Sequence, residues 1–362
     1  MEITAAVARG ADAPFSIERL TLAAPGPGEV LVRIVASGIC HSDLTAKQNF
    51  PAELPIVLGH EGAGIVEEVG SGVAGIKAGD HVIVTYSSCG ACALCERGLP
   101  GYCDDWVVLN GGKYGPDSPL SGGGQPVVGA FFGQSSFASH ILTGPRNLVV
   151  VDDDIDLALT AAFGCGIQTG AGTVANVLAP DSNSSVVIFG VGGVGMAGLM
   201  AAQALGAGTV IAVDLSESRL EIAKELGADA VIDGAAGDVA EQIKAATGGG
   251  ATHALDTTGV EQVVANAIDA LAPLGTLALV ALGASSLPIE VAKLTGLGKS
   301  LRGSIEGDCD PQVFIPQLID WYRQGRFPMD KLVRTYPFAD INDAVAAAHS
   351  GAAVKPVLTF TS

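Results

Sequence analysis

The sequence contains few charged residues, and basic residues are the scarcer of them. Charged side chains make up 16% of the 362 residues, and 19 Lys and Arg stand against 38 Asp and Glu, which gives a formal net charge of −19. Nucleic-acid binding depends on clustered Lys and Arg, so this balance argues against a nucleic-acid partner. The hydrophobic share of 48% argues against disorder and predicts a compact protein with a large core.

The sequence also lacks a segment that clearly indicates export or a membrane span. Glu2, Arg9 and Asp12 interrupt the N-terminal stretch, where a signal peptide needs an apolar core. The stretch Ser184–Val213 has no charged residue and is long enough to cross a bilayer. Its glycines and its strand-then-helix pattern argue against a span, so we expect a cytoplasmic protein with no membrane partner.

The length of the chain predicts two domains. In the first 150 residues, short apolar runs such as Val30–Ala36 and Ile65–Val69 are separated by Gly, Pro and Asp, which is typical of an antiparallel β domain. From Ser185 onward, strands alternate with helical stretches, which predicts a parallel doubly wound sheet and therefore the α/β class. The predicted strands of this sheet are Val186–Phe189, Thr209–Val213, Ala230–Ile232, Thr252–Leu255 and Thr276–Leu282.

The regular alternation ends near residue 300. The remaining segment contains an amphipathic helix, Val313–Gln324, and a short β-like terminus, Val354–Phe360. We expect this tail to rejoin the first domain.

The first strand of the predicted parallel sheet leads into a glycine pattern, Gly190-x-Gly192-x-x-Gly195, that is followed by a helix and a second strand. These glycines permit a tight turn, a close backbone approach to a pyrophosphate and close packing of the helix. Asp214 ends the second strand, where a carboxylate binds the ribose hydroxyls and repels a 2′-phosphate, which favours NAD over NADP. A solvated Asp214 is the alternative, and nearby Arg219 could tolerate a phosphate.

Four of the seven cysteines lie in one short loop, residues 89–103. Four thiolates close a tetrahedral shell and leave no position for substrate, so this loop predicts a structural zinc site. An iron centre and a redox disulfide pair are the alternatives. The four cysteines are Cys89, Cys92, Cys95 and Cys103.

A catalytic zinc needs three protein ligands and one open position. Cys40, His60 and Cys165 are the candidates, although each could instead be a buried structural residue, and their spacing does not join them.

Several motifs occur in the order seen in zinc-containing medium-chain alcohol dehydrogenases, and the resemblance runs nearly from end to end. It implies a GroES-like catalytic domain at 1–160 and 301–362 and an inserted Rossmann NAD-binding domain at 161–300. It also implies two zinc ions per chain and a homodimer or homotetramer formed by strand pairing near Leu287–Arg302. The motifs are GICHSD (38–43), GHEGAGIVEEVG (59–70), the four-cysteine loop, GCGIQTG (164–170) and GVGGVG (190–195).

The resemblance assigns roles around the catalytic zinc. It implies that Cys40, His60 and Cys165 are the ligands, with Glu61 as a carboxylate near the metal and Asp43 as the partner that orients the histidine. Zinc would act as a Lewis acid toward the alcohol oxygen, which lowers the pKa of the alcohol.

The resemblance also implies residues for the proton and for the cofactor. Ser42 would accept the alcohol proton, although a serine that caps a helix is the alternative. Thr45 stands where several family members have a histidine that releases this proton, so the relay must end in water, in His41 or in another residue. The implied cofactor contacts are His41 and Lys355 at the pyrophosphate, Thr169 and Val194 at the nicotinamide, and Gly193 in the glycine turn.

Phe131 and Phe132 fall in the substrate-pocket segment of the family, and Phe50 is a further pocket candidate, although core packing explains two of these three rings equally well. The tail LRGSIEGDCDP (301–311) resembles the aryl and allylic branch, which includes benzyl alcohol and geraniol dehydrogenases. We therefore predict reversible oxidation of a primary aromatic or terpenoid alcohol. In this tail, Glu306 is either functional or a solvated loop residue, and Cys309 has no assigned role.

Other functions stay open at this point. A glutathione-dependent formaldehyde dehydrogenase needs a cationic mouth, which the low Lys and Arg content opposes. A broad-range alcohol dehydrogenase is a further alternative. The three candidate catalytic ligands oppose a zinc-free quinone reductase, and the nucleotide-binding pattern opposes a non-enzymatic zinc module.

Overall fold

The computed structural model describes every residue except 52, 282, 284–285 and 361–362, and the chain divides into two compact units. The first unit comprises Met1–Cys165, Asp310–Pro316 and Leu332–Ser362. The second unit comprises Gly166–Cys309 and Gln317–Lys331.

The first unit is rich in short strands. Its strands are β1 (Glu2–Ala8), β2 (Ser16–Leu22), β3 (Val30–Gly38), β4 (Ile56–Val57), β5 (Gly62–Val69), β6 (His81–Val84), β7 (Gly111–Lys113), β8 (Leu120–Gly122), β9 (Gln125–Val127), β10 (Gly129–Phe131), β11 (His140–Thr143), β12 (Leu148–Val151), β19 (Val333–Pro337) and β20 (Lys355–Thr359). Its helices are α1 (His41–Asn49), α2 (Ala93–Glu96), α3 (Trp106–Asn110), α4 (Leu157–Thr160) and α12 (Ile341–Ser350), with single turns at η1 (Pro100–Tyr102), η2 (Gly115–Asp117), η3 (Pro145–Asn147), η4 (Ala161–Gly164) and η8 (Phe338–Asp340).

The sheets of the first unit join both ends of the chain. Their order is β12-β6-β5-β3-β20-β19, with β11 also on β3, and β4-β1-β2-β8-β9. The pairs among β1 to β12 are antiparallel, which confirms the predicted β-rich class of this unit. Strand β20 pairs antiparallel with β3 through Leu358 and Ser37, so a strand near the end of the chain joins a sheet formed mainly by residues 30–151.

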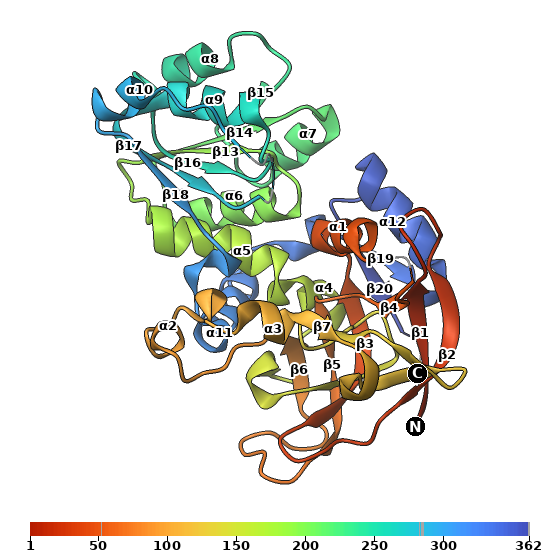
Figure 1. The fold of residues 1–362 in the computed structure, drawn as a ribbon. Helices are drawn as coiled ribbons and strands as arrows, with labels where there is room; N and C mark the ends of the chain where they lie inside the picture. The colour runs from red at the N-terminus through yellow and green to blue at the C-terminus, as the bar shows by residue number, and fades with distance from the viewer. Residues whose placement is uncertain (52, 282, 284–285, 361–362) are drawn as a thin grey trace. The chain divides into compact units, whose positions relative to one another are not determined.

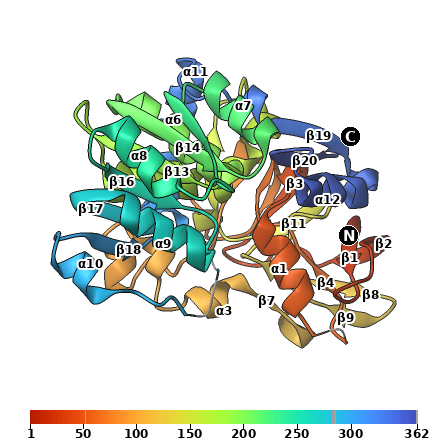
Figure 2. The ribbon, with the colours of Figure 1, turned by 90° about the horizontal axis from the view of Figure 1, so that it is seen from above.

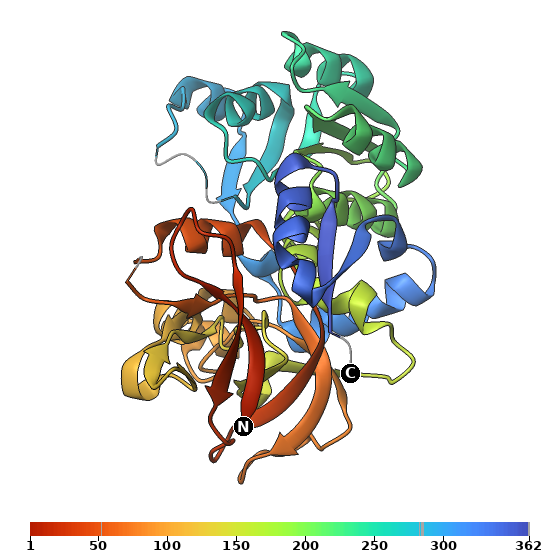
Figure 3. The same cartoon turned by 90° about the vertical axis from the view of Figure 1, so that its right-hand side faces the viewer.

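One hydrophobic core of the first unit draws on both ends of the chain. Ile3 and Val7 of β1 and Leu20 of β2 pack in one cluster with Ile341 of α12 and Leu358 of β20. In Figure 3, α12 (blue) accordingly lies beside the N-terminal strands (red). Burial of this shared apolar surface stabilises the union of the two segments.

The second unit alternates strands and helices. Its strands are β13 (Ser185–Phe189), β14 (Thr209–Asp214), β15 (Ala230–Asp233), β16 (Ala251–Asp256), β17 (Leu271–Leu279) and β18 (Ser300–Gly303). Its helices are α5 (Gly166–Gly172), η5 (Thr173–Leu178), α6 (Gly193–Leu205), α7 (Glu217–Glu225), α8 (Val239–Thr247), α9 (Glu261–Ala270), α10 (Val291–Thr295), η6 (Glu306–Asp308) and η7 (Met329–Lys331), while α11 (Pro311–Arg323) begins in the first unit and ends in the second.

The sheet of the second unit is parallel, in the order β15-β14-β13-β16-β17-β18 within the described residues. This order confirms the predicted doubly wound class. The chain reverses its direction of winding between β13 and β16, and the crevice beyond the carboxyl ends of these strands is where such sheets bind ligands.

Helices cover both faces of this sheet. Figure 1 shows α8 and α9 on one face and α5 and α6 on the other. Val187 and Phe189 of β13 point to the first face, where they join Val239 and Ile243 of α8 and Val264 of α9 in one core. In Figure 2, α8 and α9 lie together over the strands.

The second compact unit begins and ends later in the chain than the predicted Rossmann domain at 161–300, whose limits stay a prediction. Its first residue is Gly166, and residues 301–309 and 317–331 belong to it rather than to the first unit. Strand β18 accounts for the later end, because it continues the parallel sheet beside β17. The four-residue strand Ser300–Gly303 has no strong β pattern of its own and was not predicted.

The predicted strand Thr276–Leu282 corresponds to β17, and Leu282 lies outside the described residues. The segment Leu287–Arg302, expected to pair with a second copy, includes α10 and most of β18, the edge strand of the described sheet. This pairing stays a prediction.

Among the described residues, no single helix meets the length and hydropathy of a membrane span, but the bent pair Leu157–Gly164 and Gly166–Leu178 meets both.

Candidate functional site

The structure brings together the side chains of Cys40, His60 and Cys165, all in the first unit. Their potential ligand atoms lie within 4.8 Å of one another. Cys40 follows β3 at the start of α1, His60 precedes β5, and Cys165 follows η4. Two strand ends and one helical turn therefore place residues that are distant in sequence at one point.

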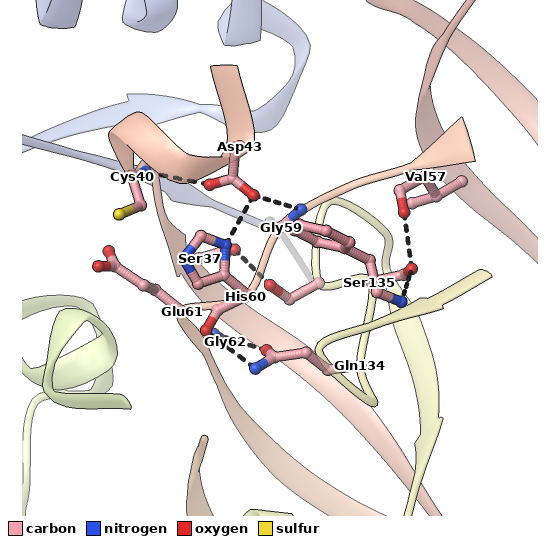
Figure 4. Close-up of polar contacts among 12 residues, drawn as sticks. Ser37, Cys40, Asp43, Val57, Gly59, His60, Glu61, Gly62, Gln134 and Ser135 are labelled. Atoms are coloured by element: carbon pink, nitrogen blue, oxygen red, sulfur yellow. Dashed lines mark hydrogen bonds and ion pairs between the residues drawn. The ribbon is translucent and has the colours of Figure 1, made fainter. Parts of the chain in front are cut away.

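Asp43 holds two of these three residues in place (Figure 4). It is fully buried in the first turn of α1, and its Oδ1 accepts hydrogen bonds from His60 Nδ1 at 2.8 Å and from the Gly59 backbone N–H at 2.9 Å. Its Oδ2 accepts the Cys40 backbone N–H at 3.1 Å. Because the carboxylate accepts from Nδ1, His60 is the tautomer that carries its proton there, and the lone pair is on Nε2.

The Nε2 atom of His60 is buried and has no hydrogen-bond partner among the described residues. Such an orphaned polar atom is costly unless a ligand satisfies it. Two cysteine sulfurs within 4.8 Å and one imidazole nitrogen are a donor set that suits zinc and leaves a fourth position for another ligand. The residues present therefore fit a zinc ion.

The charges around this cluster favour the ligand form of Cys40. A hydrogen bond from Cys165 lowers the pKa of Cys40 well below its usual range, against the effect of burial. Burial lowers the pKa of His60, but the charges of Asp43 and Cys40 outweigh it and raise this pKa well above its usual value, so a metal that binds Nε2 must displace a proton from it. A thiolate is the form of cysteine that binds metals.

Glu61 and Lys355 form a buried ion pair near the cluster. Lys355 Nζ donates to both carboxylate oxygens of Glu61 at 2.9 Å, and the two side chains are 5% and 0% exposed. Burial raises the pKa of Glu61, although Lys355 opposes this rise. Burial lowers the pKa of Lys355, but the Glu61 carboxylate reverses the effect, so the ammonium stays charged.

The predicted contact of Lys355 with the cofactor pyrophosphate stays a prediction. In the structure the ammonium is buried and paired with the Glu61 carboxylate.

Two aromatic rings contact the imidazole of His60. Phe132 stacks on the imidazole with ring centroids 4.5 Å apart, and Phe131 meets it edge-on at 5.7 Å. Trp106 packs edge-on against Phe132 at 5.9 Å. Phe50, the third predicted pocket residue, packs against the same hydrophobic core to which Phe131 belongs and against which Phe132 packs, so the assignment of these three rings to a substrate pocket stays a prediction.

The predicted proton-relay residues lie in the first turns of α1. Ser42 is the second residue of this helix and Cys40 is its N-cap, so Ser42 is not the capping serine of the alternative interpretation. His41 is exposed, and Thr45 is half-buried one turn later. The end of the relay stays a prediction.

The second cysteine group lies in the predicted loop. The sulfurs of Cys89, Cys92, Cys95 and Cys103 all lie within 4.8 Å of one another. Hydrogen bonds from backbone N–H groups, chiefly that of Asp104, lower the pKa of Cys92 to about 6, whereas burial raises the pKa of Cys95 to about 12. Four sulfurs in this arrangement suit a closed tetrahedral zinc site.

The glycine turn of the second unit lies between β13 and α6. Gly190 has a φ of +82°, and a Cβ on Gly195 would lie 1.9 Å from the Gly190 carbonyl oxygen. A Cβ on Gly192 would meet nothing within 4 Å, so the backbone there is open to a ligand. The N-terminus of α6, which begins at Gly193, supplies backbone N–H groups and a positive dipole end for an anion.

Asp214 lies at the carboxyl end of β14 next to this turn. Its Oδ2 accepts the Val191 N–H at 2.8 Å, and its Oδ1 accepts the Ser216 N–H at 2.9 Å. The carboxylate is 9% exposed, so it is not the solvated aspartate of the alternative interpretation. Arg219 Nη1 lies 3.8 Å from Asp214 Oδ2, which directs this cation toward the carboxylate.

The structure places the two predicted nicotinamide contacts, Thr169 and Val194, on α5 and α6, and both are half-buried in the second unit.

Glu306 is buried, at 6% exposure, and its Oε2 accepts hydrogen bonds from Gln168 Nε2 at 3.1 Å and from Thr169 Oγ1 at 3.5 Å. Glu306 is therefore not a solvated loop residue. Cys309 is buried beside it, with its thiol directed at the Glu306 carbonyl oxygen.

Sequence reasoning missed two groups of residues that support this site. Gln134 bonds the carbonyl oxygens of His60 and Thr85 and accepts the Gly62 N–H, so it holds the chain on both sides of His60 and Glu61 (Figure 4). Trp106 and Asn110 of α3 contact Phe132. The sequence signal that could have indicated them is their position next to motifs: Gln134 follows the phenylalanine pair, and Trp106 follows Cys103.

Comparison with known proteins covers both units. Residues 26–153 match the family model "Alcohol dehydrogenase GroES-like domain", and residues 193–324 match "Zinc-binding dehydrogenase". A geraniol dehydrogenase of Castellaniella defragrans is 46% identical over 98% of this chain and 97% of its own.

Two solved structures are similar over the full length of both chains. One is an alcohol dehydrogenase zinc-binding domain protein from Burkholderia ambifaria, at 47% identity and a TM-score of 0.97. The other is a benzyl alcohol dehydrogenase from Acinetobacter calcoaceticus, at 40% identity and a TM-score of 0.95.

The Asp43 to His60 contact leads to a first prediction. Asp43→Asn removes the charged acceptor of Nδ1, so we expect zinc affinity at the cluster of Cys40, His60 and Cys165 to fall about 10- to 100-fold. Competition with a chromogenic chelator measures this affinity. Asp156→Asn, which changes the N-cap of α4, is the control and should retain zinc; equal retention by both variants would contradict the assigned role of Asp43.

The four-cysteine loop leads to a second prediction. Cys95→Ser removes one of four ligands from a loop with few core contacts, so we expect bound zinc to fall from two ions to one and the loop at 89–103 to become sensitive to protease. Metal analysis and mapping of the cleavage sites measure both effects. Cys309→Ser, which alters a buried cysteine outside both groups, should retain two ions.

Proposed function

Since the chain belongs to the zinc-dependent alcohol dehydrogenase family, we propose that it oxidises a primary aromatic or allylic alcohol to the aldehyde, with hydride transfer to NAD, and that it catalyses the reverse reaction. The observation that carries this proposal is the buried, unsatisfied Nε2 of His60, beside two cysteine sulfurs and under aromatic rings.

In this proposal, Cys40, His60 and Cys165 hold the catalytic zinc, and the four-cysteine loop holds a structural zinc. The catalytic zinc supplies a Lewis acid that polarises the alcohol oxygen and lowers its pKa. Asp43 keeps His60 in the tautomer and orientation that this binding needs, and it also increases the basicity of the imidazole.

The protein also controls charge and protons around the reacting oxygen. Lys355 neutralises Glu61, a carboxylate that would otherwise disfavour negative charge developing on the alcohol. We assign to Ser42, in the first turn of α1, the role of accepting the alcohol proton. His41, the exposed neighbour of Ser42 in the chain, can then pass the proton to water.

The aromatic environment supports the substrate class. Phe131 and Phe132 present apolar rings at His60, so an aromatic or allylic chain gains contact area there that a small alcohol does not. The related geraniol and benzyl alcohol dehydrogenases carry names of the same class, which supports this choice.

Asp214 supports NAD as the hydride acceptor. Its carboxylate lies at the strand end beside the glycine turn, where it can bind two ribose hydroxyls. The same negative charge repels the 2′-phosphate of NADP.

The proposed function predicts alcohol-dependent NADH formation. We expect kcat/KM to be highest for benzyl alcohol and geraniol, lower for ethanol, and lowest for S-hydroxymethylglutathione, because the chain has few basic residues to bind the glutathione carboxylates. Absorbance at the NADH band during steady-state turnover measures this order. A preference for the glutathione adduct would replace the proposal with the formaldehyde dehydrogenase alternative, and no turnover of any alcohol would overturn it.

The cofactor choice predicts a specific effect of Asp214→Ala. Loss of a charged acceptor for two ribose hydroxyls costs about 1.5–3 kcal/mol, so the ratio of kcat/KM for NAD to that for NADP should fall about 10- to 100-fold. Asp233→Ala is a matched control, because Asp233 ends the neighbouring strand β15 in register with Asp214 but is exposed. A ratio that Asp214→Ala leaves unchanged would refute the assignment.

A further inference from the structure

We propose that Trp106 is a positioning residue that sets the selectivity of this enzyme for aromatic over small alcohols, by holding the ring of Phe132 against His60. This inference rests on the proposed function. Trp106 itself contacts Phe132 and Tyr86 rather than His60.

Phe132 lies in a strained segment of the backbone. Its φ is +52°, and those of Ala130 and Ser135 are +54° and +59°. A non-glycine residue in this left-handed region costs about 1–2 kcal/mol, and such strain persists only where the surrounding structure holds it. The conformation of Phe132 therefore depends on its neighbours.

Two asparagines hold the backbone of Phe132. Its N–H donates to the Asn110 carbonyl oxygen at 3.0 Å, and its own carbonyl oxygen accepts from Asn147 Nδ2 at 3.2 Å. The next residue must be small, because a Cβ on Gly133 would lie 2.0 Å from Ser87 Oγ. These contacts fix the chain but leave the ring to be held by other groups.

The ring of Phe132 contacts the imidazole of His60, the indole of Trp106 and the ring of Phe131. It stacks on His60 with an interplanar angle of 30°, and Trp106 meets it at 88°. Stacked and edge-to-face pairs of this kind each contribute about 0.5–1.5 kcal/mol beyond the area that they bury. Phe131 also meets this ring edge-on at 4.9 Å. Without Trp106, the ring of Phe132 therefore loses one of the two edge-on contacts that restrain its position on His60.

Trp106 is in turn positioned by the four-cysteine loop. It begins α3, three residues after Cys103, and its N–H donates to the Cys103 carbonyl oxygen at 2.9 Å. Asn110 ends the same helix, and its Nδ2 donates to the Trp106 carbonyl oxygen at 2.9 Å. One short helix that leaves the metal loop therefore supplies both the backbone contact and the ring contact of Phe132.

The consequence for substrate selection follows from contact area. A Phe132 ring locked against His60 is a rigid apolar surface beside the zinc ligand, and a flat or unsaturated substrate gains contact with it. Ethanol is too small to gain as much. Loosening the ring should therefore raise KM for benzyl alcohol far more than it changes turnover of ethanol.

The test compares Trp106→Ala with wild type on benzyl alcohol and ethanol, with NAD. We expect the ratio of kcat/KM for benzyl alcohol to that for ethanol to fall at least about 10-fold, chiefly through KM. Trp106→Phe, which retains an aromatic edge, should restore the ratio to within about 3-fold of wild type. Val107→Ala, at an exposed residue of the same helix, is the control and should leave the ratio unchanged.

The outcomes separate the two proposals. A purely structural role of Trp106 would lower the active fraction and leave the ratio unchanged, and this result would overturn the inference alone. If Trp106→Ala does not fold or loses zinc, Trp106→Leu replaces it, since leucine fills space without an aromatic edge, and an unchanged ratio there also overturns the inference. Absence of alcohol oxidation by the wild type would overturn the proposed function itself.

Discussion

The buried carboxylate of Asp43 is the interaction on which the first unit's metal-binding cluster depends. It accepts three hydrogen bonds, from Cys40, Gly59 and His60, and so ties the start of α1 to the chain that enters β5. A buried carboxylate is costly unless it is fully paired, so this arrangement requires all three donors in place at once. The local chain is shaped accordingly: Gly59 has a φ of +91°, and a Cβ there would lie 2.5 Å from Phe137.

The same cluster shows how an acidic protein manages charge in its interior. Two thiolates, Asp43 and Glu61 would concentrate negative charge in one buried place, and the ion pair of Lys355 with Glu61 offsets part of it. A zinc ion, which the orphaned Nε2 of His60 favours, would balance the thiolates. Basic residues are scarce in the chain as a whole, but one of them, Lys355, is buried here, where its positive charge pairs with Glu61.

The parts of the site that were predictable from sequence are those whose chemistry lies within one short segment. The glycine turn at Gly190 and the four-cysteine loop each contain their own spacing, so local chemistry alone indicated a nucleotide and a metal. Cys40, His60 and Cys165 are far apart in the chain, and only resemblance to a family joined them before the structure placed them within 4.8 Å. Trp106 and Gln134 belong to no such pattern, because they act through contacts with residues from other elements.

By itself, the sequence determined the α/β class, the alternation of strands and helices in the second unit, the glycine turn and the four-cysteine loop, because each depends on residue type and local spacing. Only the tertiary structure decided the partners of side chains that pack across elements. It paired Lys355 with Glu61, buried Glu306 beside Thr169, packed Phe50 against the core and stacked Phe132 on His60. These contacts join segments that are distant in the chain, and the burial and chain geometry that select them exist only once the sheets have formed.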